Sequence, residues 1–282
     1  MTDTTNLFED SQLMIFDLDG TLYEDTDHFA YYAHLLKQEV DEAFRSAYER
    51  EYKKMINGEH TLKIGSVYDL VRDHIVEIDS SSSRVTHAWT WDGDPLSEDE
   101  RQRLYPTPVE CDFETMMAIG DGWWLPNACA RHFGVNDTDT AYVKTKEYMA
   151  AEQFSLTRIP GLREGLLHLK QKRDIVLVTN SDPDDVGRLL DRLDLDDIFE
   201  DRVTVAKKPQ YTKNHFSQLL KEYDVRPHEA ISIGDNYINE IAPAIQLGLK
   251  TIFIDAYNSN YPEYKGVKVD SISETIEDML EL

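Results

Sequence analysis

The 282-residue sequence has few cysteines, no long apolar run and few basic residues. Cys111 and Cys129 are its only cysteines, and since they lack CxxC spacing we expect free thiols in a reducing compartment. No apolar run approaches the ~18 residues that a membrane-spanning helix needs. Residues 1–12 are polar and acidic, unlike a secretion signal, so the sequence predicts a cytoplasmic protein.

Basic residues are outnumbered, because 29 Lys and Arg stand against 54 Asp and Glu, for a formal net charge of −25. Such an excess disfavours nucleic acid and anionic lipid, so we expect neither a nucleic-acid nor a membrane partner. It is typical of salt-adapted proteins, but ordinary solubility explains it as well. The 41% of hydrophobic residues suffices for one large domain or two of ordinary size. No feature of the sequence indicates an oligomeric state.

A short apolar run near the beginning of the chain ends in two carboxylates. Residues 13–16 are typical of a buried strand, and Asp17 and Asp19 follow directly. If the extended chain continues for one more step, both carboxylates face the same side. Two anions this close resist ionisation unless a cation lies between them, which favours a divalent metal with oxygen ligands. The alternative is an acidic turn, because Asp-Gly is a common turn pair.

The stretch that follows, from about Glu24 to Phe154, is predicted to be mostly helical. Apolar residues recur there at spacings of three and four, and a serine cluster at residues 80–83 predicts a loop. The expected elements are one helix or a helix pair over residues 27–57, helices over 62–78, 97–105, 124–133 and 136–154, and a short strand around Trp89 and Trp91.

Beyond Pro160 and Gly161 the pattern becomes an alternation of helices and strands. The expected helices are 162–172, 184–193, 214–223, 241–247 and 272–280, and the expected strands are 175–178, 203–205, 230–233 and 251–254. Such alternation predicts a parallel sheet covered on both faces. The fold class is therefore α/β, a Rossmann-like doubly wound core (residues 1–24 and 155–282) with an inserted, mostly α-helical cap (residues 25–154).

Polar residues gather at the ends of the expected strands, which is where open parallel sheets bind ligands. A phosphoryl group needs a metal, an ammonium and a hydroxyl donor, and an aspartate can serve as nucleophile. Each short motif alone is a common turn or loop, but together they favour phosphoryl chemistry. The residues are Asp17, Asp19, Thr179, Asn180, Ser181, Lys207, Lys208, Asp235 and Glu240.

Four motifs in this order resemble those of the haloacid dehalogenase superfamily. The motifs are Asp17-Leu18-Asp19-Gly20-Thr21-Leu22, Thr179-Asn180-Ser181, Lys208-Pro209 and Gly234-Asp235-Asn236. The resemblance covers nearly all of the expected core, and the helical stretch is similar to the mobile cap that many members insert after the first motif.

The resemblance implies a role for each catalytic position. Asp17 is the nucleophile that becomes phosphorylated, and Asp19 is the general acid and base. Thr179 holds the phosphoryl oxygens, and Lys208 screens charge and orients Asp17. The lysine is doubled, so Lys207 is an alternative, although the following proline makes Lys208 the better match.

The same resemblance implies a Mg²⁺ site made by Asp17, Asp235 and the backbone carbonyl of Asp19. Members usually carry a further aspartate four or five positions after the last motif aspartate, where this chain has Asn239 and Glu240. We expect Glu240 to substitute for it through water, with Asn239 as the alternative.

The substrate side is less well defined by the motifs. Leu18 is expected to give its backbone N–H to the phosphate, and Asn180 to add another donor. Trp123, Trp124 and Tyr23 are candidates to close over a substrate, although such aromatics are more often core residues.

The expected activity is Mg²⁺-dependent hydrolysis of a small phosphorylated metabolite. Members of the family that cleave carbon–halogen bonds do not retain the second carboxylate, because halide leaves without a proton, so Asp19 favours phosphate esters. One alternative is a phosphomutase or phosphotransferase of the beta-phosphoglucomutase type, and another is a non-catalytic binding protein that keeps the fold.

Overall fold

The computed structural model divides into two compact units, which we describe separately. The core unit comprises Met1–Asp25 and Glu152–Leu282, and the inserted unit comprises Thr26–Ala151. Within the described residues, none of the helices has both the length and the apolar character required to cross a bilayer. The structure describes residues 3–79, 82–151, 154–257, 259, 261 and 264–282.

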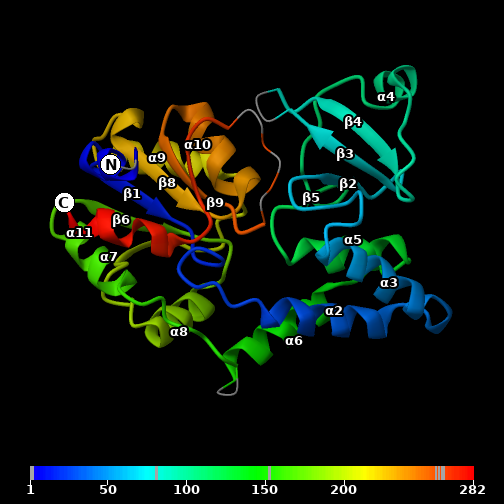
Figure 1. Cartoon of the computed structure of the whole chain (residues 1–282), viewed down its shortest axis with the longest axis horizontal. Helices are drawn as coiled ribbons and strands as arrows, with labels where there is room; N and C mark the ends of the chain where they lie inside the picture. The colour runs from blue at the N-terminus through cyan, green and yellow to red at the C-terminus, as the bar shows by residue number, and fades with distance from the viewer. Residues whose placement is uncertain (1–2, 80–81, 152–153, 258, 260, 262–263) are drawn as a thin grey trace. The chain divides into compact units, whose positions relative to one another are not determined.

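The core unit is built on a six-stranded parallel sheet (Figure 1). From edge to edge the strands are β10 (Val267–Val269), β9 (Lys250–Ile254), β8 (Ala230–Gly234), β1 (Leu13–Phe16), β6 (Asp174–Val178) and β7 (Asp201–Val203). β1 lies in the middle, where Leu13 is level with Ala230 on one side and with Asp174 on the other. The predicted parallel α/β sheet is thus confirmed, and the residues that follow β1 emerge at its centre.

Helices cover both faces of this sheet, as right-handed crossovers require. The apolar side chains of Leu13 and Ile15 pack in one cluster with those of α9 and α10, and α7 packs against α11 on the other face (Figure 1). The helices of the core unit are α1 (Asp3–Glu9), α7 (Leu162–Lys170), α8 (Pro183–Leu193), α9 (Thr212–Glu222), α10 (Ala242–Leu247) and α11 (Ile276–Leu280), with short turns η2 (Pro227–Glu229), η3 (Tyr237–Ile241) and η4 (Ile272–Thr275).

The inserted unit combines helices with a second, antiparallel sheet. Its helices are α2 (Asp27–Glu39), η1 (Glu42–Phe44), α3 (Arg45–Ile56), α4 (Glu98–Leu104), α5 (Trp124–His132) and α6 (Asp139–Ala150). The pair α2 and α3 confirms the helix pair expected over residues 27–57. Ser97 opens α4 through a reciprocal capping box with Glu100.

The helix predicted over residues 62–78 is wrong, because this stretch forms β2 (Val67–Asp69) and β3 (His74–Ile78). Gly65 and Asp73 have positive φ angles of 98° and 57°, which a helix does not accommodate. Together with β4 (Val85–Thr90) and β5 (Met116–Ala118) these strands form a four-stranded sheet in the order β4-β3-β2-β5. The inserted unit is therefore less helical than the sequence indicated.

The expected elements also did not include α1 and β10 of the core unit. Both are short, and β10 pairs only through Val267 to Val269 with β9. The loop expected at residues 80–83 lies partly outside the described residues, because residues 80 and 81 are not described.

Candidate active site

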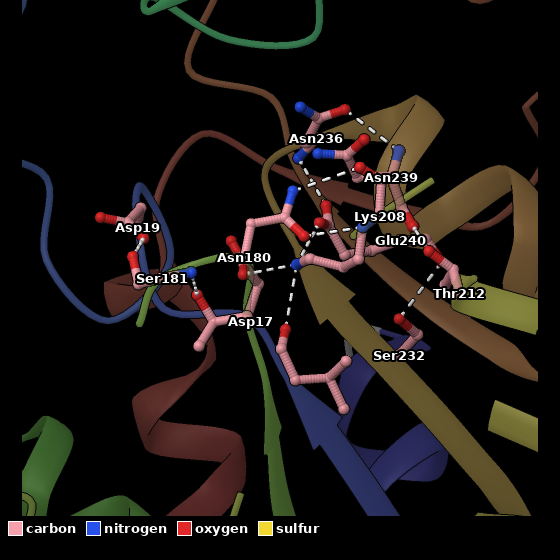
Figure 2. Close-up of polar contacts among 12 residues, drawn as sticks. Asp17, Asp19, Asn180, Ser181, Lys208, Thr212, Ser232, Asn236, Asn239 and Glu240 are labelled. Carbon is pink, nitrogen blue, oxygen red and sulfur yellow. Dashed lines mark hydrogen bonds and ion pairs between the residues drawn. The ribbon is translucent and has the colours of Figure 1, made fainter. Parts of the chain in front are cut away.

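The carboxyl edge of the core sheet brings together side chains that are far apart in the sequence (Figure 2). The ammonium of Lys208 donates to Asp17 Oδ1 at 2.6 Å, to Glu240 Oε1 at 2.6 Å and to the Val178 carbonyl at 3.0 Å. Asp17, Lys208 and Glu240 are all buried. One cation is therefore shared by two carboxylates in a water-poor environment.

This arrangement perturbs all three groups. Burial raises the pKa of Asp17 and of Glu240, and the nearby ammonium only partly opposes that effect. Burial by itself lowers the pKa of Lys208, but the carboxylates of Asp17 and Glu240 hold it above its ordinary value. The lysine stays charged and balances one negative charge, so the pair of carboxylates needs a further cation to be fully ionised.

The donor set suits Mg²⁺. Asp17, Asp235 and Glu240 each place a carboxylate oxygen within 4.8 Å of the others, which is the one such cluster among the described residues. Mg²⁺ prefers oxygen ligands such as these carboxylates. Both oxygens of Glu240 already have donors, since Oε1 accepts from Lys208 and Oε2 accepts the N–H of Asn236 at 3.0 Å. Glu240 is accordingly a weaker candidate for a direct ligand.

Gly20 allows the loop after β1 to approach Asp235. Its φ of 75° lies in the left-handed region that favours glycine. A Cβ at this position would lie 2.2 Å from Asp235 Oδ2 and 2.6 Å from its Cγ, so the Asp235 carboxylate would have to move. The glycine in the first motif thus leaves room for the Asp235 carboxylate next to the loop after β1.

Asn180 brackets the backbone of Lys208 from the neighbouring strand end. Its Oδ1 accepts the Lys208 N–H at 2.7 Å, and its Nδ2 donates to the Lys208 carbonyl at 3.2 Å. Two more backbone bonds join the same loops, from Val205 N to Ser181 O and from Ala206 N to Thr179 O, both at 3.0 Å. The loop after β7 is therefore held against the loop after β6, and these hydrogen bonds fix the position of the Lys208 backbone.

The carboxylate of Asp19 lies apart from the lysine cluster (Figure 2). It accepts hydrogen bonds from Tyr23 OH and Ser181 Oγ, and it is not one of the three carboxylates that come within metal-binding range of one another. The sequence did not predict that the hydroxyls of Tyr23 and Ser181 hold Asp19. Ser181 belongs to the second motif, so its presence in the site could have been predicted from the sequence. Tyr23 belongs to none of the motifs, and its spacing of four positions from Asp19 was the one indication of its role.

The remaining candidates fall into two groups. Thr179 is buried at the end of β6, where its Oγ1 accepts the Ser181 N–H at 3.2 Å, and the Leu18 side chain is buried in the core unit. Trp123 and Trp124 belong to the inserted unit, where their rings lie 4.9 Å from His28 and 4.4 Å from Phe113. These two tryptophans are part of the aromatic packing of that unit.

Comparisons with known proteins agree with this geometry. A family model for haloacid dehalogenase-like hydrolases matches residues 12–248. The glyceraldehyde 3-phosphate phosphatase of Pyrococcus furiosus is 30% identical over 134 residues, which are 43% of this chain and 55% of that protein. A haloacid dehalogenase-like hydrolase domain-containing protein 3 of Xenopus laevis is 28% identical over 141 residues, 47% and 57% of the two chains. This chain thus spans about half the length of the curated relatives it matches.

A solved structure shows the same fold. The hydrolase YfnB of Bacillus subtilis, crystallised with magnesium, matches with a TM-score of 0.51 and 16% identity, over 95% of this chain and 98% of that one. The parallel core, the site at the carboxyl ends of its strands and the family match over most of the sequence lead to one conclusion. The chain belongs to the haloacid dehalogenase-like hydrolases.

Proposed function

We propose that this protein is a Mg²⁺-dependent phosphatase that hydrolyses a small phosphate monoester through a phosphorylated Asp17. The observation that carries the proposal is the convergence of Asp17, Lys208, Asp235 and Glu240 at the carboxyl edge of the core sheet. A buried carboxylate oriented by a lysine is a suitable nucleophile toward phosphorus. The expected chemistry takes place in two steps.

In the first step a carboxylate oxygen of Asp17 forms a bond to phosphorus while the bond from phosphorus to the ester oxygen breaks. The proton that this leaving oxygen needs comes from the carboxylic acid form of Asp19, which becomes a carboxylate. In the second step water attacks the same phosphorus and gives a proton to Asp19, while the bond from phosphorus to the Asp17 oxygen breaks. The products are the alcohol, inorganic phosphate and the free carboxylate of Asp17.

Other residues of the chain position these groups. Lys208 neutralises charge on Asp17 and on the transferring phosphoryl group, Glu240 and Asn180 hold Lys208, and Thr179 donates to a phosphoryl oxygen. Bound between Asp17 and Asp235, Mg²⁺ would supply the positive charge that the two carboxylates and the phosphate require. In this proposal Glu240 serves the metal indirectly, through the lysine that it shares with Asp17.

The substrate is proposed from the relatives. The matched proteins of Pyrococcus furiosus and Pyrococcus abyssi are both glyceraldehyde 3-phosphate phosphatases, so glyceraldehyde 3-phosphate is the first physiological ester to assay. Contact of the substrate with Trp123 and Trp124, and the cytoplasmic setting, stay predictions from the sequence.

The test is to trap the phosphorylated residue. The purified protein is mixed with 4-nitrophenyl phosphate and Mg²⁺, quenched in acid, and digested for mass spectrometry. We expect phosphate release, and a phosphorylated peptide containing Asp17 that is missing in Asp17→Asn. Accumulation of the phosphorylated peptide with release only on adding a sugar would indicate a phosphotransferase. Absence of both turnover and phosphorylation would refute the proposal and favour a binding protein.

A further inference from the structure

Two hydroxyl groups hold the carboxylate of Asp19, one on each oxygen. Tyr23 OH donates to Oδ1 at 2.5 Å, and Ser181 Oγ donates to Oδ2 at 2.9 Å. Tyr23 is fully buried, and Ser181 is 4% exposed. Because the two donors come from different loops, together they fix both the place and the rotation of the carboxylate.

The two donors differ in how firmly they are themselves held. Tyr23 lies in the same loop as Asp19 and forms a backbone bridge with it, and its buried ring leaves the hydroxyl a single position. The hydroxyl of Ser181 sits on a short side chain after β6, so rotation about one bond is enough to take it away from Asp19. When Asp19 turns one oxygen toward a leaving group, Tyr23 is therefore the donor that keeps hold of the other.

We propose that Tyr23 is a positioning residue for Asp19, aligning its carboxyl group for proton transfer to the leaving oxygen, while Ser181 is the donor that is released. This inference rests on the proposed phosphatase function. Burial, followed by the charge of Asp19, raises the pKa of Tyr23 well above its ordinary value, so the phenol keeps its proton and acts only as a donor.

The leaving group distinguishes positioning from a general structural role. A phenolate with a nitro group departs without much help, whereas an unsubstituted phenolate depends more on the proton from Asp19. Misalignment of Asp19 therefore slows phenyl phosphate more than 4-nitrophenyl phosphate. Loss of folded protein, of metal or of phosphate binding slows both esters by the same factor.

The experiment measures kcat/KM for phenyl phosphate and 4-nitrophenyl phosphate in one preparation of each variant, with saturating Mg²⁺. Because the ratio of the two values cancels the fraction of folded enzyme, it is informative even for a poorly folding variant. We expect Tyr23→Phe to lower the phenyl phosphate value about tenfold more than the 4-nitrophenyl phosphate value. In Ser181→Ala the ratio should change less than in Tyr23→Phe.

Tyr48→Phe is the matched control, because Tyr48 is also a buried tyrosine but its hydroxyl donates to the Ala33 carbonyl in the inserted unit. Its ratio should equal that of the wild type. In an Asp19→Asn background, Tyr23→Phe should leave the ratio unchanged, since there is no proton left to align. Equal losses on both esters in Tyr23→Phe, or a larger change of ratio in Ser181→Ala, would overturn the inference. Absence of wild-type turnover of 4-nitrophenyl phosphate would instead refute the proposed function.

Discussion

Both units of the molecule bury carboxylates, but they do so in different ways. In the inserted unit, Asp69 is fully buried, and its oxygens accept from the backbone of Val71 and Arg72 at 2.9 Å, from the Arg72 guanidinium at 3.1 Å and from Tyr105 OH at 2.8 Å. In the core unit, Asp17 and Glu240 share the ammonium of Lys208. Asp69 thus has hydrogen-bond donors on both oxygens, whereas Asp17 and Glu240 together carry more negative charge than Lys208 balances.

This difference separates a structural carboxylate from a functional one. A buried anion with a complete set of donors stabilises a turn and leaves no capacity for another ligand. A buried cluster with too few positive charges costs stability unless it is completed from outside, and such clusters are typical of active sites. Five predictions test this comparison, from the largest expected effect to the smallest.

The largest effect is expected for Asp17→Asn, which removes the proposed nucleophile. Turnover of 4-nitrophenyl phosphate should fall by at least about 1,000-fold, while thermal stability is retained or increases because one of the competing charges is gone. Steady-state kinetics and thermal melting of the same preparation measure both. Near wild-type activity would rule out Asp17 as the nucleophile.

Removal of divalent metal should abolish activity and leave the fold intact. Treatment with EDTA leaves the cluster of Asp17, Asp235 and Glu240 without its cation, and addition of Mg²⁺ should restore turnover. We also expect Mg²⁺ to raise the melting temperature, because it binds only the folded state. Full activity in EDTA would contradict the metal requirement.

Glu240→Gln tests the surplus charge directly. The amide keeps an acceptor for the Asn236 N–H but loses the charge that faces Lys208, so the stabilisation by Mg²⁺ should shrink more than the stability of the metal-free protein. Titration of the melting temperature with Mg²⁺ measures this. Glu222→Gln, on an exposed position of α9, is the control. An unchanged Mg²⁺ titration would shift the expected role to Asn239.

Tyr105→Phe tests the carboxylate that is already satisfied. Removal of the hydroxyl takes one donor from buried Asp69 and should lower the free energy of unfolding by about 1–3 kcal/mol. The kcat for 4-nitrophenyl phosphate should change by no more than about twofold, since Tyr105 has no part in the proposed chemistry. Urea unfolding measures the change in the free energy of unfolding, and steady-state assays measure kcat. A large loss of kcat with unchanged stability would break the distinction between the two units.

The smallest effect concerns Asp112, on the surface of the inserted unit. Its slight burial raises the pKa, but the backbone N–H groups of Thr115, Met116 and Glu114 outweigh this and hold it at about 2, below the ordinary 3.8. A depressed folded-state pKa gives stability that is present above pH 3.8 and is lost as the pH falls toward 2. Asp112→Asn should flatten this part of the dependence of stability on pH. The check is the urea midpoint of unfolding measured as the pH falls from 3.8 toward 2. The same decrease in Asp112→Asn as in the wild type would contradict the prediction.

Much of the core unit could be predicted from the sequence, and less of the inserted unit. The strand that ends just before Asp17 and the strand before Asn180 are short apolar runs closed by polar motifs, a pattern typical of buried parallel strands. In the inserted unit, residues 62–78 carry apolar side chains at spacings that fit a helix, yet Gly65 and the turn capped by Asp69 make them strands. Pairing partners such as β5 lie too far along the chain for a local pattern to reveal them.

The family, the parallel core and the identity of the charged groups at its edge could be predicted without the structure, because they depend on local patterns and on motifs in a given order. How these groups pair became visible in the folded chain. It joined Lys208 to both Asp17 and Glu240, turned the amide of Asn180 toward the lysine backbone, and placed Tyr23 and Ser181 on Asp19. The physical reason is that hydrogen bonds and ion pairs depend on distances of a few ångströms between loops, which spacing along the chain does not encode.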